Sequence, residues 1–127
     1  MNKAVNNWVK SSEYDIKMVK KRSQIEKTIR LFVINLKRKG IKVNRVILYG
    51  SYAKGNHRPG SDIDVAVISS TFNSKNLLER QELLGEAIFG ISEPVEAIGY
   101  SYNEFRKPRV LSFLFDIISN GKVIYPE

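Results

Sequence analysis

Apolar residues recur at helical spacing between residues 23 and 40. The members of this stripe lie three or four positions apart and would share one face of a helix: Ile25, Ile29, Phe32, Val33 and Leu36. Ser23 and Glu26 form a capping box at its start, and Gly40 follows a cluster of basic residues at its end. The pattern predicts an amphipathic helix that buries one face.

Later in the chain, short apolar runs alternate with helical patterns. The runs that predict strands cover residues 46–49, 61–68, 94–100 and 122–125. Between them, residues 74–89 predict a helix, and Asn103 is expected to cap a last helix that continues past Pro108 to Asn120. This alternation predicts an α/β or α+β domain in which helices flank a small mixed β-sheet.

The chain of 127 residues is long enough for one domain with its own core. Residues 3–20 also have a helical pattern, and we expect a helical extension over residues 1–22 before the domain over residues 23–127. No apolar run approaches the roughly 20 residues of a membrane span, and the first residues lack the apolar core of a signal peptide. The absence of cysteine excludes disulfides and thiolate metal sites. These features predict a cytoplasmic protein without a membrane segment.

The net charge of +8 is concentrated in the first part of the chain. Residues 1–45 carry 13 Lys and Arg residues against 3 acidic residues. A surface of this composition suits a polyanion or an acidic protein, and a solvated helix face has the same composition. Nucleic acid is the least favoured partner, because no basic loop carries the interleaved aromatic residues that stack on bases.

Candidate chemistry concentrates in residues 44–66. Asp62 and Asp64 alternate with Ile63 and Val65 in a predicted strand, so both carboxylates point to one face, about 6.5 Å apart along the backbone. Two carboxylates on one face repel each other, and a divalent cation between them removes that repulsion. Hard carboxylate oxygens are the ligands that Mg²⁺ prefers. The pattern predicts a magnesium site, and the alternative is a strand with two solvated aspartates.

The glycine-rich segment before these aspartates predicts the other half of a binding site. Gly50 and Ser51 directly follow the apolar run over residues 46–49. Glycine at such a position lets the backbone approach a ligand, and exposed N–H groups attract phosphate. A phosphate-binding segment beside paired aspartates is typical of a site for a metal and a nucleoside triphosphate.

The two segments together resemble a known motif. Gly50-Ser51-Tyr52-Ala53-Lys54-Gly55, followed by Ser61-Asp62-Ile63-Asp64, is similar to the GSxAxG…SDxD motif of the polymerase-β-like nucleotidyltransferases. The short chain resembles their minimal branch in particular. The resemblance implies the nucleotidyltransferase fold and a Mg²⁺-dependent transfer of a nucleoside monophosphate, with ATP favoured as the donor, to a hydroxyl group.

The resemblance also implies roles for individual residues. The nucleotide-binding set would be Gly50, Ser51, Lys54, Arg58 and Ser61, and the catalytic and metal-binding set would be Asp62, Asp64 and Glu96. Such enzymes commonly use two metal ions. His57, the only histidine, is expected to be a loop residue rather than a base. Tyr49, Tyr52 and Tyr100 are candidates for stacking on the base, and each could equally belong to the core or the surface.

The third carboxylate lies outside the motif that contains the first two. The resemblance implies that it lies on the next core strand and faces the two aspartates. Glu96, inside a Val-Glu-Ala-Ile run, fits this position, and Glu93, just before Pro94, is the alternative. Glu96 would complete one metal shell and help to deprotonate the incoming hydroxyl. Members of the family usually carry aspartate here.

We expect another molecule to complete the site. The chain is too short for the extra domain with which larger nucleotidyltransferases hold their acceptors. The resemblance implies an antitoxin-like protein that transfers AMP to a tyrosine of a HEPN-type toxin. One alternative is an enzyme acting on a small molecule such as an aminoglycoside, for which a homo-oligomer would supply the missing wall. Another is a catalytically inactive module that only binds a partner.

Overall fold

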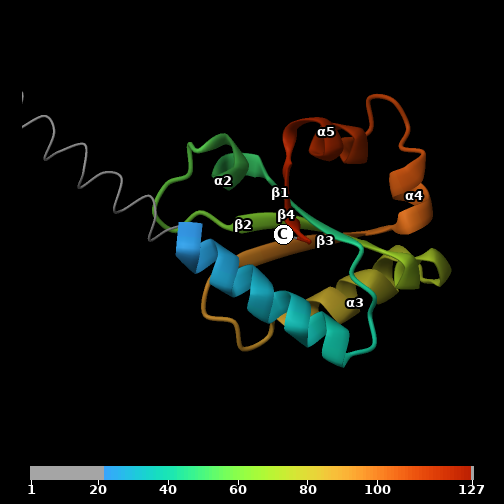
Figure 1. Cartoon of the computed structure of the whole chain (residues 1–127), viewed down its shortest axis with the longest axis horizontal. Helices are drawn as coiled ribbons and strands as arrows, with labels where there is room; N and C mark the ends of the chain where they lie inside the picture. Colours follow the sequence, from blue (N-terminus) through green and yellow to red (C-terminus); the bar gives the residue numbers. More distant parts are fainter. Residues whose placement is uncertain (1–21, 127) are drawn as a thin grey trace, which may run out of the picture.

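The computed structural model describes residues 22–126, and within them four strands form one mixed sheet (Figure 1). The strands are β1 (Arg45–Tyr49), β2 (Ile63–Ser69), β3 (Val95–Ser101) and β4 (Lys122–Tyr125), and their order across the sheet is β3-β2-β1-β4. β1 runs antiparallel to β2 and β4, whereas β2 and β3 are parallel. The fold class expected from the sequence is confirmed.

Helices cover both faces of this sheet. The first lies over residues 22–38, and it is followed by α2 (Gly50–Lys54), the 3-10 turn η1 (Ser70–Ser74), α3 (Leu77–Ile88), α4 (Tyr102–Arg106) and α5 (Phe113–Asn120). The helix over residues 22–38 and α3 lie on one face, and α4 and α5 lie on the other (Figure 1). Within residues 22–126, no helix is long and apolar enough to cross a membrane.

β2 runs through the middle of the molecule and is buried on both faces. Val65 and Val67 pack into the core beneath the helix over residues 22–38 and α3, while Ala66 and Ile68 pack into the core beneath α5. Successive side chains of a strand point to opposite faces, so this one strand supports both helical layers. Phe32, from the predicted helical stripe, is also completely buried. The amphipathic helix expected from that stripe is confirmed.

The prediction of one long last helix is wrong. The structure divides residues 102–120 into α4 and α5, and each has its own cap. The hydroxyl of Ser101 accepts a hydrogen bond from the backbone N–H of Glu104 at 3.0 Å and completes a capping box. A serine cap stabilises the first turn of a helix. Asn103, the expected cap, therefore lies inside α4.

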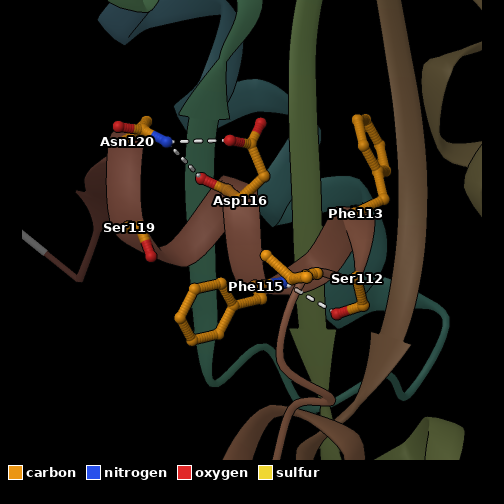
Figure 2. Close-up of a pocket in the computed structure, with 7 residues that line it drawn as sticks. Ser112, Phe113, Phe115, Asp116, Ser119 and Asn120 are labelled. Atoms are coloured by element: carbon orange, nitrogen blue, oxygen red, sulfur yellow. Dashed lines mark hydrogen bonds between the residues drawn. The ribbon is translucent and has the colours of Figure 1, made fainter.

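Between α4 and α5 the chain makes an irregular connection. Pro108 has no N–H to donate, and Leu111 has a φ of 67°, which lies outside the helical region. Ser112 then begins α5, because its Oγ accepts a hydrogen bond from the N–H of Phe115 at 3.1 Å (Figure 2). The apolar positions that predicted a continuous helix thus include residues of an exposed loop.

Three further boundaries differ from the sequence prediction. Residues 50–54 form the short helix α2, which is not among the helices expected from the apolar pattern. α3 starts after its cap, Asn76, rather than at Ser74. β2 starts at Ile63, so Asp62 precedes the strand. The expected helix over residues 3–20 lies outside the described residues, and the expected domain boundary stays a prediction.

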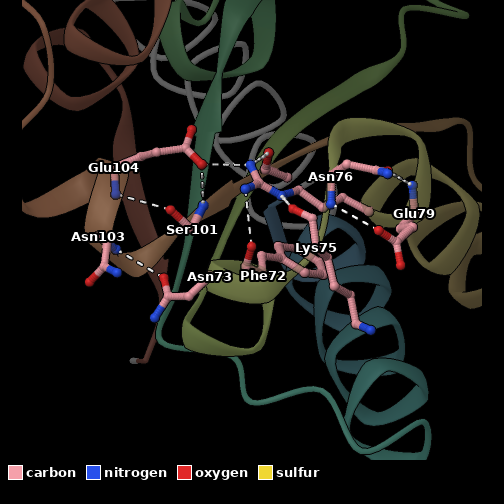
Figure 3. Close-up of polar contacts among 10 residues, drawn as sticks. Phe72, Asn73, Lys75, Asn76, Glu79, Ser101, Asn103 and Glu104 are labelled. Atoms are coloured by element: carbon pink, nitrogen blue, oxygen red, sulfur yellow. Dashed lines mark hydrogen bonds and ion pairs between the residues drawn. The ribbon is translucent and has the colours of Figure 1, made fainter.

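A buried arginine joins α3 to α4 through the end of β3 (Figure 3). Arg80 is only 8% exposed, and its guanidinium donates hydrogen bonds to the carbonyl oxygens of Lys75 and Phe72 at 2.9 and 3.0 Å. Its Nη1 lies 2.6 Å from a carboxylate oxygen of Glu104. Burial alone would raise the pKa of Glu104, but hydrogen bonds from Ser101 and the ion pair with Arg80 outweigh burial and lower it. The network fixes the position of α4.

Candidate active site

Side chains of three neighbouring strands form a row at one end of the sheet. Tyr49 of β1 pairs with Asp64 of β2, and Asp64 pairs in turn with Glu96 of β3. Residues directly opposite one another in a sheet point to the same face. The structure therefore brings Glu96 beside Asp64, and it adds Tyr49 to the same row.

Asp64 lies in an environment that disfavours its negative charge. Burial contributes most to raising its pKa, followed by the charges of Glu96 and Asp62 and by a side-chain hydrogen bond with Glu96. A hydrogen bond between two carboxyl groups needs a shared proton, which relieves their repulsion in the protein alone. A divalent cation would relieve the same repulsion.

Asp62 stands slightly apart from the row. It is exposed and precedes β2, although its charge still contributes to the raised pKa of Asp64. Carboxylate oxygens are the donors that Mg²⁺ takes, so the chemistry of the donor set fits this metal. Within residues 22–126, however, no three acidic, histidine or cysteine side chains converge closely enough to hold a metal ion together. Binding would require Asp62 or Glu96 to turn, or phosphate oxygens to complete the shell.

Glu93, the alternative third acid, lies outside this row. It precedes β3, and one of its carboxylate oxygens accepts a hydrogen bond from the side-chain amide of Gln24. Glu96, by contrast, lies within β3 at the register position of Asp64. Of the two candidates, only Glu96 has its charge among the causes of the raised pKa of Asp64.

Gly50 lies against the carboxylate of Asp64. Its φ is 72°, a backbone conformation that side chains with a Cβ rarely adopt. A Cβ at this position would lie 2.5 Å from Oδ2 of Asp64. The glycine of the motif is therefore needed for two independent reasons, the backbone conformation and the space for the carboxylate.

The motif continues into α2 and the loop after it. Tyr49 precedes α2, and its side chain forms no cap hydrogen bond to the first turn of this helix, which begins with Gly50 and Ser51. Ser51 is half-buried, and Lys54 is exposed in the last turn. Gly55 ends α2 with a φ of 76°.

The loop between α2 and β2 is closed by local hydrogen bonds. The N–H of Arg58 donates to Oγ of Ser61 at 2.9 Å, and the N–H of Ser61 donates to the carbonyl oxygen of Arg58 at 3.0 Å. The Arg58 side chain is exposed. His57 stacks on the ring of Tyr52, with ring centres 4.2 Å apart, as fits a packed loop residue. The hydroxyl of Ser61 thus shapes the loop in the protein alone.

From the sequence, Tyr49 was a candidate for stacking on the base that could equally belong to the core or the surface, and the structure gives it a more specific place. Burial, followed by the charges of Asp64 and Glu96, raises the pKa of its hydroxyl to about 12, so it is a neutral hydrogen-bond donor. Its ring packs edge-to-face against Phe113 of α5, with ring centres 5.5 Å apart. The register of β1 against β2 identifies Tyr49, and no sequence motif contains that information.

Comparisons with known proteins identify the family of this chain. Residues 29–120 match the family model described as "Nucleotidyltransferase domain". A protein of Methanocaldococcus jannaschii named "Putative protein adenylyltransferase" is 30% identical over 101 residues, which cover 79% of this chain and 97% of that protein.

Solved structures are also similar to this chain. A toxin–antitoxin crystal structure with AMP-PNP matches with a TM-score of 0.50 and 24% identity, over 74% of this chain and 70% of that chain. A "putative nucleotidyltransferase" of Sulfolobus solfataricus matches with a TM-score of 0.49 and 20% identity, over 78% of this chain and 83% of that chain.

Proposed function

Because the chain belongs to the nucleotidyltransferase domain family and is a nucleotidyltransferase, we propose that it transfers AMP from ATP, with Mg²⁺, to a hydroxyl group of a partner protein. The relative named as an adenylyltransferase of proteins supports both the nucleotide and the class of acceptor. The partner is proposed to be a HEPN-type toxin, as expected from the resemblance to the minimal branch of the family.

The observation that carries this proposal is the arrangement of Asp64, Glu96 and Gly50. Two carboxyl groups from parallel strands lie at paired register positions, where burial and the neighbouring charge raise the pKa of Asp64, and a glycine with no room for a Cβ lies against that carboxylate. A non-catalytic fold has no need for this costly arrangement of acids. A metal-bound triphosphate would compensate their charge.

We assign the following roles to the chain's own residues. Asp62, Asp64 and Glu96 would hold Mg²⁺, which supplies charge neutralisation at the triphosphate when it is bound. The backbone at Gly50 and Ser51 would bind phosphate oxygens, because Gly50 allows close approach. Lys54, Arg58 and Ser61, which lie on the same motif segment, would contribute further contacts to the phosphates.

The proposed reaction breaks one bond and forms one. The oxygen of the acceptor hydroxyl attacks the α-phosphorus of ATP, and the bond from this phosphorus to the bridging oxygen of pyrophosphate breaks. Pyrophosphate leaves with the electron pair, and the hydroxyl proton passes to a carboxylate. Glu96 is exposed at the end of the row and is our candidate for this proton.

The test is transfer of label from ATP to a co-expressed HEPN-type protein. We expect label from α-phosphate to stay on the partner after denaturation, and label from γ-phosphate to be absent from it. Asp64→Asn should abolish the labelling, whereas Glu82→Gln, at an exposed position of α3, should retain it. Wild-type protein that binds Mg-ATP and labels no HEPN-type protein would contradict the proposed acceptor.

A further inference from the structure

The connection from α4 into α5 exposes a group of large apolar side chains. Val110 is 75% exposed, Leu111 91%, Phe113 53% and Phe115 37%. Three of these four residues, Leu111, Phe113 and Phe115, line one cleft and therefore lie together on the surface, unlike single exposed apolar residues, which are common. Leu111 also has a φ of 67°, so neither its burial nor its backbone preference explains a leucine at this position.

This apolar surface begins next to the row formed by Tyr49, Asp64 and Glu96. Phe113 contacts Tyr49, and Tyr49 is the cross-strand neighbour of Asp64. Two shallow clefts adjoin Phe113. One, of about 540 Å³, runs along α5 and is lined by residues that include Leu111 and Phe115, whose aromatic ring leaves α5 in a different direction from that of Phe113 (Figure 2).

The second cleft is positively charged. Its volume is about 280 Å³, and Lys107 and Arg109 line it beside Phe113. Among residues 22–126, no carboxylate forms an ion pair with Arg106, Lys107 or Arg109. Glu104 also lines this cleft, but its charge is already paired with Arg80. The cleft therefore presents uncompensated positive charge beside an apolar surface.

We propose that residues 106–115 form the docking surface for the acceptor protein, and that this surface takes an apolar and acidic segment next to the acceptor hydroxyl. This inference rests on the proposed function. An acidic segment complements the unpaired cations, and an apolar side chain on it would cover Leu111 and Phe113. A second copy of this chain suits the surface less well, because the chain carries a net charge of +8.

The experiment uses full-length protein, α-labelled ATP, Mg²⁺ and short synthetic peptides that each contain one tyrosine. In one set Leu and Asp residues flank the tyrosine, in the second Leu and Lys, and in the third Ser and Asp. We expect kcat/KM for the Leu–Asp set to exceed that of both others by about tenfold, as for the loss of one good contact.

Two variants test the surface itself. Leu111→Gly removes the exposed side chain, and glycine accepts the positive φ, so the fold should be kept. It should remove the preference for Leu over Ser. The double variant Lys107→Glu/Arg109→Glu should reverse the preference between Asp and Lys. Leu78→Ser, 68% exposed on the opposite face of the sheet, is the matched control and should change neither preference.

The outcomes separate this inference from the proposed function. Calorimetric binding of Mg-ATP tests the nucleotide site alone and should be the same in wild type and in Leu111→Gly. Equal labelling of the three peptide sets, or labelling of none by protein that binds Mg-ATP, overturns the docking surface and leaves the nucleotide site standing. A wild-type dimer that Leu111→Gly dissociates also overturns it, because the occupant would then be a second copy.

Discussion

The carboxylate of Asp64 leaves no room for a Cβ at Gly50, the glycine that opens the motif. Gly50 and Gly55 have almost the same positive φ, 72° and 76°, yet their surroundings differ. A Cβ on Gly50 would meet Oδ2 of Asp64 at 2.5 Å, whereas a Cβ on Gly55 would have no atom within 4 Å. The two positions therefore separate the effect of backbone strain from that of the clash.

We predict that Gly55→Ala lowers the free energy of unfolding by about 1–2 kcal/mol, the cost of the left-handed conformation, with little change in Mg-ATP affinity. Gly50→Ala should lower it further and weaken Mg-ATP binding by about tenfold or more, because the carboxylate of Asp64 must move. Urea denaturation and calorimetry measure the two quantities. Equal Mg-ATP affinities for the two variants would refute the role of the clash.

The ionised carboxylate of Asp64 lowers the stability of the fold at its place in the sheet. Its raised pKa means that folding is disfavoured while the carboxylate is ionised, so the cost is absent at low pH and grows as pH rises above the unfolded pKa. Neutralising this residue should therefore not destabilise the fold. The same change removes a proposed metal ligand.

We predict that Asp64→Asn leaves the free energy of unfolding unchanged or raises it by less than about 1 kcal/mol, since solvent screens a half-buried charge. Nucleotidyl transfer should fall by about a hundredfold or more, because the metal supplies several kcal/mol to the transition state. Urea denaturation measures the free energy of unfolding, and label transfer measures the rate of nucleotidyl transfer. A variant that is much less stable and proportionally less active would indicate a structural role only.

At the scale of elements, the connection between α3 and α4 depends on an ion pair with one buried partner. Arg80 is 8% exposed, and Glu104 is its carboxylate partner at 2.6 Å. Lys39 and Glu86 form a comparable pair at 2.6 Å, but both of their side chains are substantially exposed. Exposed pairs contribute little to stability, whereas the loss of one partner of a buried charge is costly.

We predict that Glu104→Gln destabilises the fold at about pH 7 more than Glu86→Gln does. The folded pKa of Glu104 is lowered, so its contribution is present above the unfolded value of 4.5 and is lost as pH falls through the lower folded value. The difference between wild type and Glu104→Gln should thus shrink on acidification. Denaturation at a series of pH values measures it, and a difference that is constant with pH would exclude the ion pair as its cause.

Element boundaries show where local sequence information was sufficient. The helix over residues 22–38 was predicted from its apolar stripe, but Ser23, the expected cap, already lies inside it. β4 was predicted with its observed bounds. The last helix was predicted wrongly because its apolar spacing is helical on both sides of Pro108. The spacing of apolar residues does not reveal that Leu111 adopts a left-handed backbone conformation. It also does not reveal that Ser112 caps a separate helix, α5.

At the scale of the whole molecule, two cores lie on opposite faces of the sheet that carries the candidate site. Phe32 belongs to the larger core, on the face away from α5, and is completely buried. Leu31, its neighbour in sequence, is 44% exposed on the outer side of the same helix. Substitutions at these two adjacent residues therefore compare the loss of a buried side chain with the loss of an exposed one in the same helix.

We predict that Phe32→Ala lowers the free energy of unfolding by about 3–5 kcal/mol, because a large buried side chain leaves a cavity. Leu31→Ala should change it by no more than about 0.5 kcal/mol, as is usual for the surface. Urea denaturation measures both. Similar losses for the two variants would show that the helix does not bury the face assigned to it.

The sequence by itself determined the fold class of this protein and its resemblance to the nucleotidyltransferases. Gly50, Ser51, Asp62 and Asp64 lie within one short segment, so their order and the alternation along a strand were sufficient to indicate a metal and triphosphate site. The alternation of helices and strands was sufficient to indicate the sheet and its helical layers, because each apolar face must be buried.

Only the tertiary structure decided which distant residues join that segment. Glu96 rather than Glu93 lies beside Asp64 because β3 pairs in parallel with β2 in one register. Tyr49 joins the row through the antiparallel register of β1, and Phe113 reaches it through the packing of α5. Register and packing depend on contacts between residues far apart in the chain, and such contacts leave no periodic signal in the sequence.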